Sequence, residues 1–128
     1  MRMVYMQPRH RGHMRRYMSE NVYLPVNVNA IDDEYVIRAY VPGVGAEDLE
    51  IAVEGNTLTI GGEFALESAE GELVRQSELP SGRFQRTLHF AAELDASQAE
   101  AGVANGVLTL RVAKAESAKT KRIEVKAN

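Results

Sequence analysis

Few residues of this chain have the types and spacing that catalysis or metal binding requires. The sequence has three histidines, His10, His13 and His89, and no cysteine, which excludes disulfides and thiolate metal sites. The pair His10-x-x-His13 needs further ligands to hold a metal, and Gly12 between them favours a loose segment. No Gly-x-Ser-x-Gly elbow or phosphate-binding loop is present. We therefore predict no enzyme activity, no catalytic residue, no metal site and no cofactor.

The remaining titratable residues have a simple structural interpretation. His89 lies between Leu88 and Phe90 in an alternating segment, so we expect its imidazole to face solvent. The many glutamates between residues 63 and 78 are typical of a solvated surface rather than of a paired-carboxylate site.

Length and composition indicate one soluble domain with tails. The 128 residues are 45% hydrophobic and 26% charged, which is ordinary for a globular protein with one core. No apolar run approaches the roughly 20 residues that a membrane span needs, and we find no apolar block of a signal peptide. Together with the lack of cysteine, this favours a cytoplasmic protein without stable membrane insertion.

Charge is divided unevenly along the chain. Residues 1–18 contain five arginines, no acidic residue and all five methionines. The rest of the chain has 18 acidic against 10 basic residues, a net charge of −8. A basic arm should therefore attract the acidic body of its own chain or of another copy.

The basic N-terminal arm has several open interpretations. Its centre, residues 8–13, contains proline and glycine and argues against a continuous helix. Met14, Tyr17 and Met18 nevertheless have the i, i+3, i+4 spacing of a short amphipathic turn. Methionine is flexible and polarizable, which suits contact with varied apolar partners. The arm is thus a disordered leader, an adhesive segment, or a tether to nucleic acid or membrane.

Short alternating segments separated by turn residues predict an all-β domain. An Asn105-Gly106 turn leads into a strand on which Leu108, Leu110 and Val112 share one face. Further strands are expected at 22–29, 35–41, 49–53, 57–60 and 84–90, and Pro25 marks the first as an edge strand. Asp95-Ala96-Ser97-Gln98 is expected to form one short helical turn. The frequent turns and the lack of a long helix are typical of a β-sandwich or barrel.

Three features suggest binding surfaces. Residues 61–83 form an unusually long connection in which Leu73-Val74 could pair with something outside its own sheet. Arg86 lies on the apolar face of its strand, so it is either buried and paired or at an interface. Its expected partner is a carboxylate, in the same domain or across a dimer interface. Ile123-Glu124-Val125 follows a polar, alanine-rich segment, and we expect it to fill a groove elsewhere.

In their order and spacing, these segments resemble the α-crystallin domain of the small heat shock proteins, in its bacterial form. The resemblance covers about Leu24 to Val125, and the tail motif ends in valine where the family usually has isoleucine. The matching motifs are the early strands Pro25–Val28 and Tyr35–Gly43, the hairpin Leu58–Glu63, Gly82-x-Phe84-x-Arg86, Ala101-x-x-x-Asn105-Gly106-Val107-Leu108, and Ile123-Glu124-Val125.

The resemblance implies an immunoglobulin-like β-sandwich at residues 21–114. A flexible arm would precede it at 1–20, an exchange-strand loop would span about 64–83, and a C-terminal extension would follow at 115–128. The family is one of ATP-independent holdase chaperones, which bind partly unfolded proteins and prevent their aggregation. Chains would form dimers by strand exchange and larger oligomers through the C-terminal tail.

The resemblance also implies roles for individual residues. The client-binding residues would be Met3, Val4, Tyr5, Met6, Met14, Tyr17 and Met18. The dimer interface would contain Val22, Leu24, Val26, Leu73, Val74 and Arg86. The groove for the tail would be lined by Leu49, Ile51, Val53, Ala101 and Val103, and the plug would be Ile123 and Val125.

Two other binding functions are alternatives. A β-sandwich co-chaperone module of the p23 type would bind a folded partner chaperone, but such modules lack the exchange-strand loop and the tail plug. Nucleic-acid binding would use Arg9, Arg11, Arg15 and Arg16, but the acidic body opposes it and salt should abolish it. We therefore expect unfolded proteins and other copies of this chain as partners, and no nucleic acid.

Overall fold

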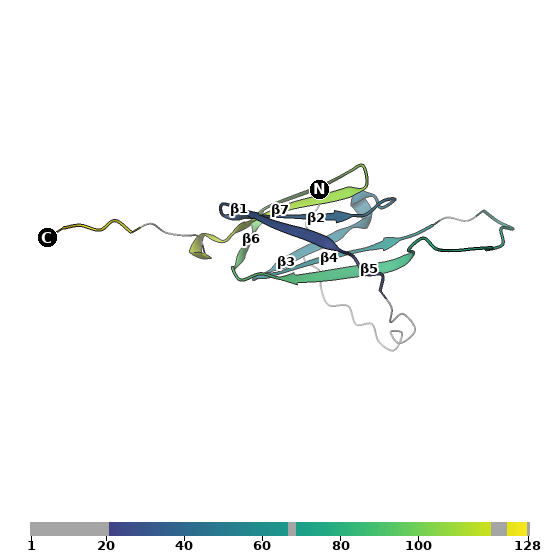
Figure 1. Cartoon of the computed structure of the whole chain (residues 1–128), viewed down its shortest axis with the longest axis horizontal. Helices are drawn as coiled ribbons and strands as arrows, with labels where there is room; N and C mark the ends of the chain where they lie inside the picture. Colours follow the sequence, from purple (N-terminus) through teal and green to yellow (C-terminus); the bar gives the residue numbers. More distant parts are fainter. Residues whose placement is uncertain (1–20, 67–68, 119–122, 128) are drawn as a thin grey trace.

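Two antiparallel sheets stack face to face (Figure 1). The computed structural model describes residues 21–66, 69–118 and 123–127. In chain order the elements are β1 (Val26–Ile31), β2 (Glu34–Tyr40), the 3-10 helix η2 (Ala46–Asp48), β3 (Glu50–Glu54), β4 (Thr57–Phe64), β5 (Gly82–His89), β6 (Leu94–Ala104), β7 (Val107–Lys114) and the 3-10 helix η3 (Glu116–Ala118). The larger sheet has the order β1-β2-β7-β6 and the smaller one β3-β4-β5. The predicted all-β sandwich is confirmed.

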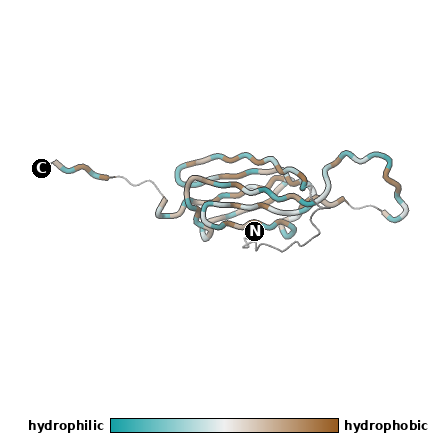
Figure 2. Tube along the Cα trace, turned by 90° about the horizontal axis from the view of Figure 1, so that it is seen from below, coloured by the Kyte–Doolittle hydropathy of each residue, from teal (hydrophilic) through white to brown (hydrophobic). Residues whose placement is uncertain are grey.

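The hydrophobic core lies between the sheets and consists of alternate residues of the strands. On β7, Leu108, Leu110 and Val112 are fully buried, as the alternation predicts, while Arg111 between them is exposed. Figure 2 shows brown and teal segments following one another along the strands. Burying a Leu, Ile or Val side chain contributes roughly 1.5–3 kcal/mol. Further fully buried side chains are Leu24, Val36, Ile37, Val41, Ile51, Leu58 and Ile60.

The β6–β7 hairpin turns at Asn105-Gly106 and contacts the end of β2. The two turn residues have positive φ angles of 53° and 77°, as expected for this pair. The carbonyl of Gly106 accepts a hydrogen bond from the Val41 N–H at 2.7 Å. A Cβ atom on Gly106 would lie 3.2 Å from the Cα of Pro42. Glycine is therefore required here for close contact as well as for the backbone angle.

Gly62 of β4 leaves the space that the ring of Phe84 fills. The two residues are partners in the β4–β5 register. A Cβ atom on Gly62 would lie 2.6 Å from Cζ of that ring and 3.2 Å from Cδ2 of Leu49. Phe84 is 2% exposed, and its ring lies 4.7 Å from that of Phe64. The core therefore depends on the missing side chain at position 62.

Residues 95–98 do not form the predicted helical turn, because they belong to β6. The β6–β7 register shifts between Asp95 and Ala99, so this part of the strand is irregular. Oδ1 of Asp95 accepts hydrogen bonds from the N–H of Ser97 at 3.0 Å and from its Oγ at 2.6 Å. Such local bonding by an aspartate competes with the ladder of a sheet, and from sequence it looks like the start of a helix.

The first strand also differs from the prediction, because β1 begins at Val26 rather than at Val22. Pro25 has no N–H to donate to a ladder, and Val22 forms only an isolated bridge with Phe84. β1 is an edge strand, as Pro25 predicts.

Two segments extend beyond the sandwich at opposite ends (Figure 1). One is the described part of the connection between β4 and β5, and the other is the C-terminal segment 123–127. In the described ranges, no helix combines the length and the apolar character needed to cross a membrane.

Candidate functional site

The four edge strands of the sandwich lie in two pairs. β3 and β6 are edges of different sheets and pack against each other. The other two edges, β1 and β5, lie on the opposite side, where the segment before β1 contacts β5. An edge strand has unpaired N–H and C=O groups that can accept a further strand. We call the two sides the β3/β6 edge and the β1/β5 edge.

The residues expected to form the groove meet at the β3/β6 edge. Leu49, Ile51 and Val53 point into the core and are 5%, 1% and 3% exposed. Ala101 and Val103 of β6 are half-buried and pack against the same core. A segment binding here would therefore contact the backbone of the edge and the two β6 side chains more than the β3 side chains.

The residues expected to form the tail plug are exposed. Ile123 is 85% and Val125 90% exposed, and the tail that carries them points away from the sandwich (Figure 1). Aliphatic side chains with this exposure gain free energy when a surface covers them.

The β1/β5 edge holds four of the residues expected in a dimer interface, Val22, Leu24 and Val26 on one side and Arg86 on β5. The N–H of Val22 donates to the carbonyl of Arg83 at 2.8 Å, so this segment adds briefly to β5 of its own chain. Leu24 is 1% exposed and belongs to the core, whereas Val26 on β1 is half-buried. The free side of β1 is thus the part of this edge that is open to another chain.

Arg86 is half-buried on β5 and bonds to the segment that precedes β1. Its Nη1 donates to the carbonyl of Leu24 at 2.9 Å and to Oη of Tyr23 at 3.3 Å. The guanidinium also lies 5.3 Å from the centroid of the Tyr23 ring, within cation–π range. Among the described residues, no carboxylate accepts a hydrogen bond from Arg86. Within the domain, the carbonyl of Leu24 and the phenol of Tyr23 take the place of the expected carboxylate.

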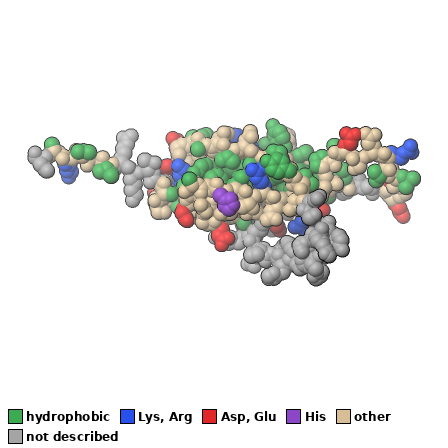
Figure 3. Space-filling view, turned by 60° about the horizontal axis from the view of Figure 1, so that its bottom comes forward, with side chains coloured by type: hydrophobic (Ala, Val, Ile, Leu, Met, Phe, Trp, Pro, Cys, Tyr) green, Lys and Arg blue, Asp and Glu red, His purple; other side chains and the backbone are tan. Residues whose placement is uncertain are grey.

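The long connection between β4 and β5 carries the other expected interface pair. Leu73 and Val74 are 83% and 81% exposed and form no strand in the single chain. The connection curves around an open hollow of about 850 Å³. Figure 3 shows hydrophobic side chains in green continuing from the sandwich onto this projecting part.

The expected client-binding residues lie in the arm, outside the described residues. These are Met3, Val4, Tyr5, Met6, Met14, Tyr17 and Met18. His10, His13 and the arginines of the arm also lie outside the described residues. His89 is exposed as predicted, with Nδ1 3.3 Å from Oγ1 of Thr57. No group of three or more potential metal ligands occurs in the described part of the chain.

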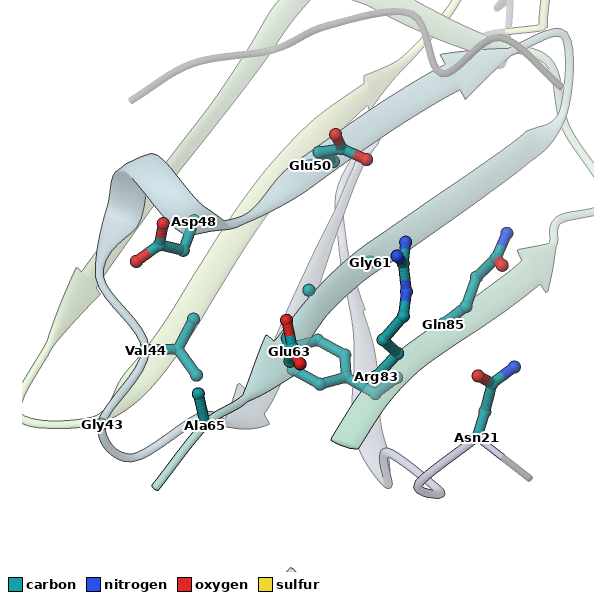
Figure 4. A pocket seen from close by; sticks show the side chains of 12 residues that line it. Asn21, Gly43, Val44, Asp48, Glu50, Gly61, Glu63, Ala65, Arg83 and Gln85 are labelled. Atoms are coloured by element: carbon teal, nitrogen blue, oxygen red, sulfur yellow. The ribbon is translucent and has the colours of Figure 1, made fainter. Parts of the chain in front are cut away.

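A polar pocket on the smaller sheet is a feature that sequence reasoning missed. It has a volume of about 340 Å³ and lies where β4 ends and β5 begins. Figure 4 shows Asp48, Glu50, Glu63 and Arg83 around it, each from a different element. Strand alternation could have predicted that Glu50 and Glu63 share the outer face of the sheet. It could not have predicted the pocket itself.

Comparison with known proteins finds one matching family and several similar sequences. Residues 27–126 match the Hsp20/alpha crystallin family. The 18 kDa heat shock protein of Streptomyces albus G is 39% identical over 103 residues, which are 80% of this chain and 72% of the relative. The 18 kDa antigen 2 of Mycobacterium avium is 36% identical over 105 residues, covering 82% of this chain and 75% of the relative.

Solved structures with similar folds also belong to small heat shock proteins. Heat shock protein 16.0 from Schizosaccharomyces pombe aligns with a TM-score of 0.67 and 34% identity, over 83% of this chain and all of the other. A small heat-shock protein from Xylella fastidiosa, described as having a distinct high order structure, aligns with a TM-score of 0.64 and 27% identity over 81% of this chain and 96% of the other.

The family match and the sandwich agree with the motifs found in the sequence. Family membership supports a chaperone role rather than an enzymatic one, and it suggests oligomers and client binding. The co-chaperone alternative is not favoured by these comparisons. Because its motifs occur in the family's order and its fold is the same β-sandwich, this chain is a member of the Hsp20/alpha crystallin family, the small heat shock proteins.

Proposed function

We propose that this protein is an ATP-independent holdase, which binds partly unfolded proteins and keeps them from aggregating. The observation that carries the proposal is the exposure of two aliphatic pairs on extensions of a well-packed sandwich. Leu73-Val74 and Ile123-x-Val125 are all more than 80% exposed, while the core residues of the strands are buried. Exposed aliphatic groups of this kind typically mark interaction sites. Chaperones of the family would use such surfaces for clients and for assembly.

The assembly that we propose uses both pairs of edges. The segment around Leu73-Val74 would add as a strand to the free side of β1 in a second chain, forming a dimer by exchange. Ile123 and Val125 would bind at the β3/β6 edge of a neighbouring dimer, next to Ala101 and Val103. The aliphatic exposure of both segments and the position of β1 at a sheet edge support this arrangement.

The tail links should be individually weak. Burying Ile123 and Val125 would contribute roughly 1.5–3 kcal/mol each. Ordering the linker between η3 and Ile123 costs about 1–2 kcal/mol of backbone entropy per residue. Several links in a closed assembly would still hold together by multivalency, while each link could open and expose its edge to a client.

Clients would also bind to the arm, through Met3, Val4, Tyr5, Met6, Met14, Tyr17 and Met18. Methionine supports this proposal, because its flexible thioether adapts to apolar surfaces of varied shape. The lack of cysteine also fits the cytoplasm as the place where the protein works.

A light-scattering assay tests the holdase function directly. A heat-denatured client should scatter less light when the protein is present near a stoichiometric ratio, and ATP should not change this. The matched control is an equal mass of a folded protein without chaperone activity. Client aggregation at the unprotected rate would contradict the proposed function.

The molar mass of the pure protein separates the two chaperone functions. A dimer or a larger oligomer is expected for a holdase of this family. A monomer would instead favour the p23-like co-chaperone module, which binds a folded partner.

A further inference from the structure

On the outer face of the β3-β4-β5 sheet, several small side chains lie between exposed carboxylates at the two ends. Strand alternation directs these positions away from the core. Glu54 lies at one end of this face and Glu63 at the other, and both are exposed. Between them the cross-strand rows are Ala52-Thr59-Thr87 and Glu50-Gly61-Gln85.

The pocket of about 340 Å³ lies at the Glu63 end of this face. Among the described lining residues, Asp48, Glu50 and Glu63 contribute three exposed carboxylates and Arg83 one guanidinium (Figure 4). The charges around the opening are therefore mostly negative. Its chemistry fits an incoming guanidinium, which can bond to a carboxylate with two parallel N–H groups.

The chain enters the described structure at this same pocket. Asn21 is one of the lining residues, and the next residue, Val22, is held to β5 by its hydrogen bond to the Arg83 carbonyl. The 20 preceding residues include five arginines and one glutamate. Fully extended, they could reach at most about 70 Å. Crossing from β5 to β3 requires only about 10 Å, since neighbouring strands lie roughly 4.8 Å apart.

We propose that residues 1–20 dock on the outer face of the smaller sheet of their own chain. Arg15 and Arg16, which come only a few residues before Asn21, would bind the carboxylates of Asp48, Glu50 and Glu63. Arg9 and Arg11 would continue over the small residues toward Glu54. Charge complementarity and the entry of the chain at the pocket both favour this occupant over an arm from another subunit.

The contact is reversible and sensitive to salt. Ion pairs at exposed positions are individually weak, and salt screens them beyond a Debye length of about 10 Å at 0.1 M. Tethering at Asn21 raises the effective concentration of the arm, so several weak pairs can act together. The docked arm would then be released as ionic strength rises.

Limited proteolysis with trypsin tests this contact, because trypsin cleaves after the arm arginines. In the full chain at low salt, we expect cleavage after Arg15 and Arg16 to be at least about threefold slower than in a synthetic peptide of residues 1–20. High salt should remove this difference, as screening predicts. The peptide, digested under the same conditions, corrects for the effect of salt on trypsin.

Two variants with the same change in net charge make the test specific. Glu50→Gln with Glu63→Gln should abolish the protection at low salt. Glu70→Gln with Glu100→Gln changes exposed residues away from this face and should leave the protection intact. Equal protection in both variants, or no protection in the wild type, would overturn the proposal.

A mixed oligomer distinguishes docking within a chain from docking between chains. Full-length chains with Glu50→Gln and Glu63→Gln are combined with chains that lack residues 1–20 but keep both glutamates. The arm should remain unprotected if it docks on its own chain. Recovered protection would mean docking on a neighbour and would overturn the proposal. The readout is proteolysis, so it does not depend on holdase activity.

Discussion

Arg86 donates a hydrogen bond from Nη1 to the carbonyl oxygen of Leu24 at 2.9 Å, and this contact joins β5 to the segment before β1. In the described part of the chain, that segment is also joined to β5 by the isolated bridge of Val22 and by packing of Leu24 in the core. The arginine of the Gly-x-Phe-x-Arg motif thus has a structural role within one chain. It links β5 to the segment before β1 across the β1/β5 edge.

Replacing Arg86 should destabilise the sandwich. Arg86→Ala removes a charge-assisted hydrogen bond to the carbonyl of the buried residue Leu24, and we expect a loss of about 1.5–3 kcal/mol in the free energy of unfolding. Urea denaturation followed by circular dichroism measures the change. Arg83→Ala is the control, because this exposed residue on the same strand should change stability by less than about 0.5 kcal/mol. Equal stability of both variants would show that the bond to Leu24 contributes nothing.

Adding a methyl group at Gly62 should disturb the core. The new Cβ of Gly62→Ala would overlap the ring of Phe84, at a cost of about 1–3 kcal/mol. Gly102→Ala on β6 is the matched control, since nothing lies within 4 Å of its Cβ position. This control should be neutral or slightly stabilising, because it reduces the entropy of the unfolded chain. Similar melting temperatures for the two variants would contradict the role of Gly62.

Removing the tail plug should separate larger oligomers into dimers. Ile123→Ala with Val125→Ala deletes the aliphatic groups but leaves the proposed exchange strand intact. Native mass spectrometry measures the outcome. The control changes Glu124→Ala and Lys126→Ala in the same tail and should preserve the wild-type mass. Oligomers of wild-type size in the plug variant would show that the tail is not the link.

Charges in the exchange segment should prevent the dimer. Leu73→Asp with Val74→Asp places two carboxylates where the proposed strand packs on β1 of the partner, and burying unpaired charge is costly. Leu66→Asp with Leu79→Asp alters two exposed leucines elsewhere in the same connection and serves as the control. Light scattering should give a monomer for the first pair and a dimer or larger for the second. A dimer in both would place the interface elsewhere.

Local patterns predicted most of the fold, because alternation and turn chemistry act over a few residues. Asn105-Gly106 and the buried face of Leu108, Leu110 and Val112 followed from the sequence directly. The sequence misled at Asp95, whose side chain bonds to Ser97 in a way common to helix starts and to irregular strands.

Contacts between distant segments could not be predicted in the same way. Gly62 carried no visible role until the register placed it opposite Phe84. Arg86 was expected to meet a carboxylate in the domain or across a dimer interface, and within the domain a carbonyl 62 residues earlier accepts its hydrogen bond instead. The polar pocket similarly joins residues from η2 to β5, which no local pattern connects.

The register shift in β6 limits how much foreign strand the β3/β6 edge can hold. Regular pairing with β7 runs only from Ala99 to Ala104, and the part before it is irregular. A guest strand adding to the outside of β6 would thus meet an even row of hydrogen-bonding groups over a short distance. A tripeptide such as Ile123-Glu124-Val125 fits that length, whereas a long aggregating strand would lose its pairing at the bulge. In the proposed chaperone role, the irregular part of β6 would keep this edge from becoming the template of a growing fibril.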